Sequence, residues 1–142
     1  MATSNATTVW EGGLAKGSGV TTPQSGAFPA TDVSWASRTE RAAGKTSPEE
    51  LLAAAHCSCY CMQLSHELEE AGTPPDSLEA TATVEFVPGE GVLSSRIVVS
   101  GRVPGIDQET FAAAAASAGD GCPISGALKN NLEISVEATL ES

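Results

Sequence analysis

The sequence predicts an α+β fold with a mostly antiparallel sheet, built as a single domain over residues 1–142. Segments of alternating apolar residues come in neighbouring pairs separated by turn residues, which is typical of hairpins rather than βαβ units. One long segment, 47–72, carries the start and stop signals of a helix. Apolar residues make up 41% of the chain, which is enough for one core.

The first predicted elements are two short strands that follow a small polar segment at 1–7. The strands cover residues 8–11 and 14–22, and the glycine pair between them is a hairpin signal. A further extended segment is expected at 33–35. Residues 38–47 are polar and contain glycine, which predicts a loop.

The central helix has the clearest boundaries in the sequence. Ser47 is placed as its N-cap, Pro48 as its first residue, and Glu50 completes a capping box. The helix is expected to run to Ala71, because Gly72 and the prolines after it end a helix.

The second half of the chain continues with a predicted antiparallel hairpin of strands 77–87 and 92–103, joined by the turn PGEG. Asp107 then caps a helix that ends near residue 118, and 122–128 form a short helical turn. An alternating strand at 132–141 follows. This order places helices between hairpins, in agreement with an α+β fold.

The charge and hydropathy of the chain exclude several classes of partner. The formal net charge is −11 with only 7 basic side chains, which argues against nucleic acid and anionic membrane surfaces as partners. We find no basic segment followed by an apolar stretch that would indicate a secretory signal, and no apolar run of membrane-spanning length. The chain is therefore expected to be cytoplasmic, where thiols are kept reduced.

Three of the 4 cysteines lie close together in the central helix, at Cys57, Cys59 and Cys61. A metal site, a disulfide or one reactive thiol would each explain them. Since a helix turns about 100° per residue, Cys57 and Cys61 share a face and Cys59 points about 200° away from Cys57. A three-cysteine metal site is poorly supported, because zinc ligands favour other spacings. Cys57 and Cys61 are most simply buried small hydrophobic residues, and spacing alone leaves the role of Cys59 open.

The same projection predicts a polar arc on this helix, formed by His56, Tyr60, Gln63 and Glu67. Met62 falls on the side of Cys59 and is expected in an apolar wall around that thiol. We assign no catalytic role to His56 or His66, since packed or solvent-facing histidines are more common.

The fourth cysteine, Cys122, stands directly before Pro123 and hence at an expected N-cap. Free amides and the positive end of the helix dipole favour a thiolate at such a position. A small residue in a tight turn is the alternative interpretation, and the spacing leaves both open.

Taken together, these motifs resemble those of a known family. The matching segments are VWEGGLAKGSGVTT, SRTE, TSPEELLAAAHCSCYCMQLSHELEEAG, VPGIDQETF and GCPISGALK. With these segments in this order, the chain resembles the OsmC/Ohr family of thiol-dependent hydroperoxide peroxidases, and within it the branch of the osmotically inducible protein C. The combination of P-E-E-L and A-A-H-x-x-C with a later G-C-P-[IV]-S is specific.

The resemblance implies four site residues. It selects Cys59 as the first active cysteine and Cys122 as the second. It implies that Arg38 stabilises the thiolate and the peroxide oxygen, and that Glu49 orients this arginine through a bidentate pair. The Ohr branch draws its arginine from the N-terminal hairpin, where Lys16 is the nearest basic residue here.

The resemblance also implies a fold and an activity. The fold is an intertwined homodimer in which each chain supplies a curved, mostly antiparallel sheet and a long buried central helix, with both active sites at the interface. The activity is reduction of organic hydroperoxides, and more weakly hydrogen peroxide, to alcohols. It would proceed through a Cys59 sulfenic acid and a Cys59–Cys122 disulfide that an external dithiol reduces. No metal and no cofactor is expected.

Alternatives remain open at this point. A disulfide reductase or hydrolase would pair Cys59 with His56, which lies three residues earlier on the helix. A non-catalytic redox sensor or ligand-binding protein would use the same cysteine pair. Cys57 and Cys61 are possible alternative disulfide partners.

Overall fold

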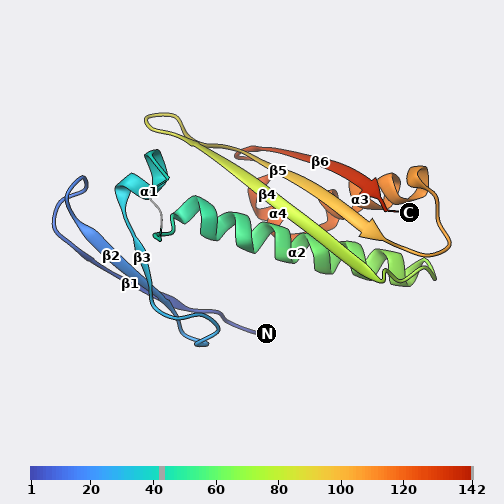
Figure 1. Cartoon of the computed structure of the whole chain (residues 1–142), viewed down its shortest axis with the longest axis horizontal. Coiled ribbons are helices and arrows are strands. Elements are labelled where there is room, and N and C mark those ends of the chain that lie inside the picture. Colours follow the sequence, from blue (N-terminus) through green and yellow to red (C-terminus); the bar gives the residue numbers. More distant parts are fainter. Residues whose placement is uncertain (42–43, 142) are drawn as a thin grey trace. The chain divides into compact units, whose positions relative to one another are not determined.

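The computed structural model describes residues 1–41 and 44–141 and shows an α+β fold with a long helix, as predicted (Figure 1). The chain forms two compact units, Met1–Leu51 and Leu52–Ser142, which we describe separately. None of the helices in the described part combines the length and hydropathy needed to cross a bilayer.

The first unit contains an antiparallel sheet of three short strands in the order β1-β2-β3. These are β1 (Ala6–Glu11), β2 (Ser18–Pro23) and β3 (Thr31–Val33). The predicted hairpin is confirmed, but its second strand starts at Ser18 rather than at residue 14. The turn is longer because Gly17 donates its N–H to the Gly13 carbonyl at 2.7 Å, in a close approach that leaves no room for a Cβ.

A short helix, α1 (Trp35–Thr39), follows β3. The sequence-based prediction was wrong here, since it extended a strand to residue 35 and began a loop at residue 38. The Ser34 hydroxyl accepts the Ser37 N–H at 3.1 Å and caps the helix. One helical turn is too short to produce an apolar period. Of the predicted loop, residues 42–43 lie outside the described residues.

The long helix α2 (Pro48–Glu70) begins as predicted, because the Ser47 hydroxyl accepts the Glu50 N–H at 3.0 Å. The Glu50 carboxylate accepts a hydrogen bond from the Thr46 hydroxyl at 2.6 Å, in place of the predicted return bond to the cap. The helix ends before Gly72, whose φ of 82° only glycine adopts without strain.

The sheet of the second unit has the order β4-β5-β6. Strands β4 (Ser77–Val87) and β5 (Gly91–Arg102) form the predicted antiparallel hairpin, with a bulge at Glu85 and Phe86. Strand β6 (Glu133–Leu140) instead runs parallel to β5. This parallel pairing was not predicted, because the helices between the two strands were interpreted as connections rather than as a βαβ crossover.

The crossover contains two consecutive helices, α3 (Gln108–Gly121) and α4 (Pro123–Leu128). The Asp107 carboxylate accepts the Thr110 N–H at 2.8 Å, which confirms the predicted cap. Cys122 ends α3 and is the N-cap residue of α4, at the position that the sequence predicted.

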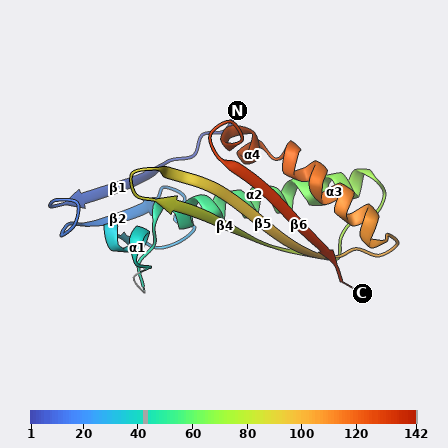
Figure 2. The same cartoon turned by 90° about the horizontal axis from the view of Figure 1, so that it is seen from above.

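Helices α2, α3 and α4 lie on one face of this sheet, and the core forms between them (Figure 2). The fully buried core side chains from α2, β5 and α3 include Tyr60, Leu64, Ile97, Val99, Phe111 and Ala115.

The buried and exposed faces of α2 differ from those that the helical projection predicted. His56 and Tyr60 are both 0% exposed, so their placement on a polar arc was wrong. Both side chains are buried, because their polar atoms have hydrogen-bond partners inside the second unit. The Tyr60 hydroxyl, for example, donates to the Ala115 carbonyl at 2.9 Å. Met62, expected in an apolar wall, is 72% exposed.

Candidate functional site

The predicted site residues form two pairs, one in each unit. Arg38 and Glu49 meet in the first unit, and Cys59 and Cys122 meet in the second. Each pair joins two different elements, and each has its own electrostatic character.

The first pair is a bidentate ion pair between the end of α1 and the first turn of α2. Arg38 Nη2 lies 2.7 Å from Glu49 Oε1, and its Nε contacts Oε1 and Oε2 at 3.1 and 3.3 Å. Glu49 is 4% exposed and Arg38 is 28% exposed. The guanidinium also stacks over the Trp35 ring, 5.6 Å from its centroid. A half-buried cation in such a fork is oriented and can face an anion.

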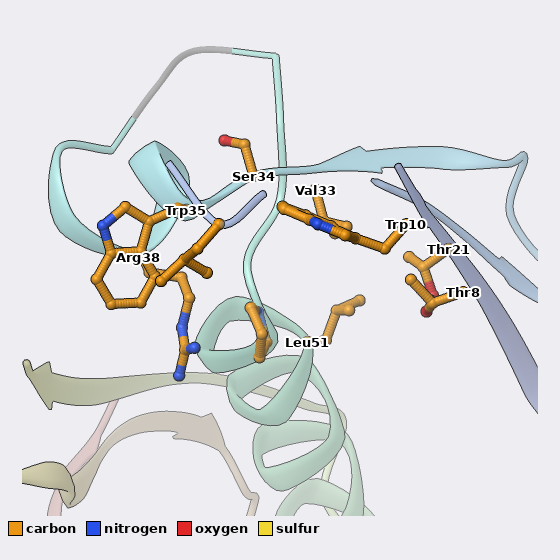
Figure 3. Close-up of a pocket in the computed structure, with 10 residues that line it drawn as sticks. Thr8, Trp10, Thr21, Val33, Ser34, Trp35, Arg38 and Leu51 are labelled. Atoms are coloured by element: carbon orange, nitrogen blue, oxygen red, sulfur yellow. The ribbon is translucent and has the colours of Figure 1, made fainter. Parts of the chain in front are cut away.

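A pocket of about 510 Å³ lies beside this arginine within the first unit (Figure 3). Apolar side chains predominate in its lining, with Arg38 as the single charged member. The lining residues are Thr8, Trp10, Leu14, Thr21, Val33, Ser34, Trp35, Arg38, Pro48 and Leu51. Lys16, the other basic residue considered, lies in the exposed turn after β1 and does not line this pocket.

The second pair joins α2 to the junction of α3 and α4. The Cys59 and Cys122 sulfurs are 3.1 Å apart, although 63 residues separate them in the chain, and both are free thiols. Cys122 is 1% exposed, whereas Cys59 is only partly buried. The sulfurs are therefore placed to form a disulfide after a small approach.

The surroundings shift the pKa values of the two thiols in opposite directions. Burial raises the pKa of Cys59, and the neighbouring Cys122 raises it further. Burial alone would raise the pKa of Cys122, but hydrogen bonding has the larger effect and lowers the pKa. The groups responsible are the backbone of Ser125, the Cys59 thiol, the Ser125 hydroxyl and the backbone of Ile124. In the reduced pair the proton is thus favoured on Cys59 rather than on Cys122.

The two remaining cysteines of α2 are only partly buried, so the expectation that they are buried was wrong. The Cys57 thiol donates to the Ala54 carbonyl at 3.6 Å. Burial, followed by the nearby Cys57, raises the pKa of Cys61.

His56 is a residue to which sequence reasoning gave no role. Its Nδ1 lies 2.6 Å from the Ser95 hydroxyl and its Nε2 lies 2.7 Å from the Ser125 hydroxyl. Burial lowers its pKa, which keeps the ring neutral. Both ring nitrogens therefore have serine partners, which argues against a Cys59–His56 nucleophile pair. No local signal points to these serines, since they lie 39 and 69 residues away.

Within residues 1–41 and 44–141, no three or more side chains of His, Cys, Asp or Glu gather as metal ligands would.

A close pair of free thiols is typical of a protein that carries out thiol–disulfide chemistry. The family model described as OsmC-like protein matches residues 41–137. The chain belongs to this OsmC-like family, as the resemblance predicted, and it is a peroxiredoxin-like peroxidase.

A curated relative agrees with this assignment, and two solved structures share the fold. Peroxiredoxin OsmC of Escherichia coli (strain K12) is 38% identical over 136 residues, covering 94% of this chain and 93% of the relative. An organic hydroperoxide resistance protein OsmC from Legionella pneumophila has a TM-score of 0.71 at 21% identity, covering 98% of both chains. The organic hydroperoxide resistance protein OhrB of Bacillus subtilis has a TM-score of 0.69 at 24% identity, covering 95% of this chain and 98% of that one. These two structures share the fold.

Proposed function

We propose that this protein reduces organic hydroperoxides to alcohols, and hydrogen peroxide more weakly, with Cys59 as the attacking thiol and Cys122 as the resolving thiol. The observation that carries the proposal is the 3.1 Å separation of these two sulfurs in a chain related to Peroxiredoxin OsmC.

In the first step the Cys59 thiolate attacks the distal oxygen of the hydroperoxide. A bond forms between sulfur and oxygen, the O–O bond breaks, and the alkoxide leaves and takes up a proton to become the alcohol. The thiolate is oxidised by two electrons to a sulfenic acid. Because burial raises the pKa of Cys59, this step depends on a cation that stabilises its thiolate.

The proposal assigns that cation to Arg38. Its guanidinium has five N–H donors, and the charge that develops on the leaving oxygen is the kind that a preorganised arginine stabilises. Glu49 orients the guanidinium through the bidentate pair. The nearly complete burial of the Glu49 carboxylate favours this role over simple stabilisation of a helix end.

In the second step Cys122 attacks the sulfur of the sulfenic acid. An S–S bond forms, the S–O bond breaks, and hydroxide leaves as water after protonation. An external dithiol then reduces the disulfide by two exchanges and is itself oxidised to a disulfide. The short distance between the two sulfurs supports an intramolecular second step.

The pocket beside Arg38 supports an organic substrate. Its lining includes two tryptophans and several aliphatic side chains, so an alkyl or aryl group gains from leaving water there, whereas hydrogen peroxide has no such group. The Legionella pneumophila neighbour is named for organic hydroperoxide resistance, in agreement with this preference.

Turnover assays test the proposal directly. Reduced protein is mixed with cumene hydroperoxide or hydrogen peroxide and a recycling dithiol, and peroxide loss is followed for the wild type, Cys59→Ser and Cys122→Ser. Cys57→Ser is the matched control on the same helix. We expect turnover in the wild type and the control, none in Cys59→Ser, and a trapped Cys59 sulfenic acid in Cys122→Ser.

The opposite outcomes are equally informative. Full activity in Cys59→Ser would overturn the assignment of the attacking thiol. A sulfenic acid trapped on Cys122 in Cys59→Ser would exchange the two roles. Disulfide formation without recycling turnover would indicate a redox sensor.

A further inference from the structure

Helix α2 carries a second pair of thiols, Cys57 and Cys61, on a different face from Cys59. Both are free and only partly buried. The helix is continuous from Pro48 to Glu70, so the two residues lie on one face, one helical turn apart. Cys59 points about 200° away from Cys57 and meets Cys122 at 3.1 Å. The proposed peroxide cycle uses Cys59 and Cys122, which leaves Cys57 and Cys61 without a role.

The spacing of Cys57 and Cys61 is too wide for a disulfide. Residues four apart on a helix have Cβ atoms about 5–6 Å from each other. A disulfide needs Cβ atoms about 3.5–4.5 Å apart, so an S–S bond between these two residues would distort the helix. A single atom that bonds to both sulfurs adds the missing length. The pair is therefore suited to a bridging atom rather than to a direct bond between its sulfurs.

The surroundings of the two sulfurs leave room for such an atom and for a group attached to it. The Cys57 thiol donates to the Ala54 carbonyl at 3.6 Å, and a thiol is a weak donor, so this contact costs little to break. Cys61 lines a pocket of about 500 Å³ between α2 and residues 75–78. The apolar side chains of this pocket are Met62, Pro75 and Leu78. An apolar group attached to the bridging atom would therefore leave water in this pocket.

The type and number of ligands identify the bridging atom. Thiol sulfurs are soft ligands and select soft acceptors. A structural zinc ion takes four protein ligands, and two sulfurs supply only half of them. Trivalent arsenic that carries one organic group takes only two sulfurs, because its third bond is to carbon. The product has no charge, which suits a partly buried site, and burial raises the pKa of Cys61, in agreement with an uncharged adduct.

We propose that Cys57 and Cys61 form a dithiol site for organic compounds of trivalent arsenic, with the organic group in the pocket beside Cys61. An organoarsenous acid, R–As(OH)₂, bonds to both sulfurs. Two As–S bonds form, two As–O bonds and two S–H bonds break, and the hydroxyl groups leave with the thiol protons as two molecules of water. Nothing is oxidised or reduced, so the reaction needs neither a peroxide nor a reductant. The site goes beyond the proposed function and does not depend on it.

The pair formed by Cys59 and Cys122 is a competing dithiol, and the test must separate the two pairs. In the background variant Cys59→Ser/Cys122→Ser, only Cys57 and Cys61 remain as thiols. Phenylarsine oxide is the probe. Intact-mass spectrometry counts the bound phenylarsenic groups, and a thiol reagent counts the remaining free thiols. Competition with glutathione, which has one thiol, then gives the apparent affinity of each variant.

Three further changes in this background separate the spacing of the thiols from their number. Cys61→Ser leaves one thiol. Cys61→Ser/Met62→Cys restores two thiols, but at positions that are about 140° apart on the helix. This variant is the matched control, because the residue that it changes is exposed and its thiol count equals that of the background protein. Met62→Ala keeps the dithiol and removes one apolar side chain from the pocket.

We expect the background protein to bind one phenylarsenic group and to lose both free thiols, with an unchanged helical circular dichroism signal. Its apparent affinity should exceed that of Cys61→Ser by about 10²–10⁴-fold, the gain typical of two linked attachments. Cys61→Ser/Met62→Cys should bind no more tightly than Cys61→Ser. Met62→Ala should weaken binding of the phenyl compound but not of the corresponding methyl compound.

Equal affinity in the background protein and in Cys61→Ser/Met62→Cys would overturn the proposal, because thiol number alone would then explain the binding. A second comparison keeps Cys122 in place: the reduced wild type should bind two phenylarsenic groups and Cys57→Ser/Cys61→Ser only one. The same number in both would also overturn the proposal. A protein that binds the arsenical as expected but consumes no hydroperoxide would refute the proposed function and not this site.

Discussion

The two units of this protein bury different kinds of side chain. Every buried apolar core residue among the described residues lies in the second unit. The buried polar or charged side chains of the first unit are Thr21, Ser37, Thr46, Ser47 and Glu49. Most of the large apolar side chains that are exposed also belong to the first unit. They are Met1, Val9, Trp10, Leu14, Val20 and Phe28.

The contrast shows how much each unit depends on other contacts. The second unit has its own core, which holds the dithiol pair in place. The first unit instead leaves these large apolar side chains exposed at its surface. This surface supports the homodimer that the family resemblance predicts, and the dimer remains a prediction.

The two pairs of predicted site residues, Arg38–Glu49 and Cys59–Cys122, also differ from one another in the charge of their groups. Arg38 carries a permanent charge and is held by a bidentate salt bridge with part of the guanidinium exposed. Cys122 lies in the core, and the groups that lower its pKa are uncharged. A cation suits the stabilisation of a peroxide oxygen, whereas neutral donors stabilise a buried thiolate without adding a second buried charge.

Among the substitutions that test this comparison, removal of the Arg38 guanidinium should have the largest effect, and the effect should be on kcat/KM. Arg38→Gln should lower kcat/KM for cumene hydroperoxide by about 10²–10³-fold, the range found when one donor to a developing oxyanion is removed. Stopped-flow measurement of peroxide loss checks it. Lys16→Gln, at the other basic residue considered, should have little effect. A larger loss in Lys16→Gln than in Arg38→Gln would reassign the cation.

Two phenylalanines, one in each unit, compare how much a buried and an exposed ring contribute to the free energy of unfolding. Phe111 is 0% exposed in the second unit and Phe28 is 42% exposed in the first. Phe111→Ala should lower the free energy of unfolding by about 3–5 kcal/mol. Phe28→Ala should change it by no more than about 0.5 kcal/mol in dilute protein.

Denaturant titrations at low and high protein concentration measure both variants. A large loss in Phe28→Ala that appears only at high concentration would mean that a second copy covers this residue. Equal losses at all concentrations would contradict the exposure of Phe28 and remove the contrast between the units.

The smallest expected effect concerns pH and His56. The folded-state pKa of His56 lies below the unfolded value of about 6.5, so the unfolded chain binds a proton that the folded chain does not. Stability should be unaffected above that pH and should fall as pH drops below it. Melting temperatures between about pH 7.5 and 5 measure the slope. His56→Gln should flatten it; an unchanged slope in His56→Gln would show that other groups cause it.

The local features of the fold were predictable from short stretches of sequence. Ser47, Asp107 and Cys122 are at the predicted cap positions, and β4 has the predicted bounds. Caps and alternation depend on side chains within one turn or one strand, and the sequence displays them directly. The single turn of α1 was missed, although Ser34 is a capping residue, because no period supports so short a helix.

Long-range features could not be predicted in this way. The sequence placed His56 on a polar arc by residue type, yet the ring is buried because two distant serines satisfy it. The parallel pairing of β6 with β5 depends on how the α3–α4 crossover packs, which no local window shows. The contact of Cys59 with Cys122 was implied only by the family resemblance.

The sequence by itself therefore determined the elements other than α1, the caps at Ser47, Asp107 and Cys122, and the two cysteine motifs, since these follow from neighbouring residues. Only the tertiary structure decided which atoms surround each thiol. Burial and the neighbouring Cys122 raise the pKa of Cys59, and both depend on the fold. The pKa of Cys122 is lowered by nearby groups of α4, as its cap position predicted, and also by Cys59, which the fold brings close. Hydrogen bonding and desolvation act over a few ångströms in space, whatever the separation along the chain.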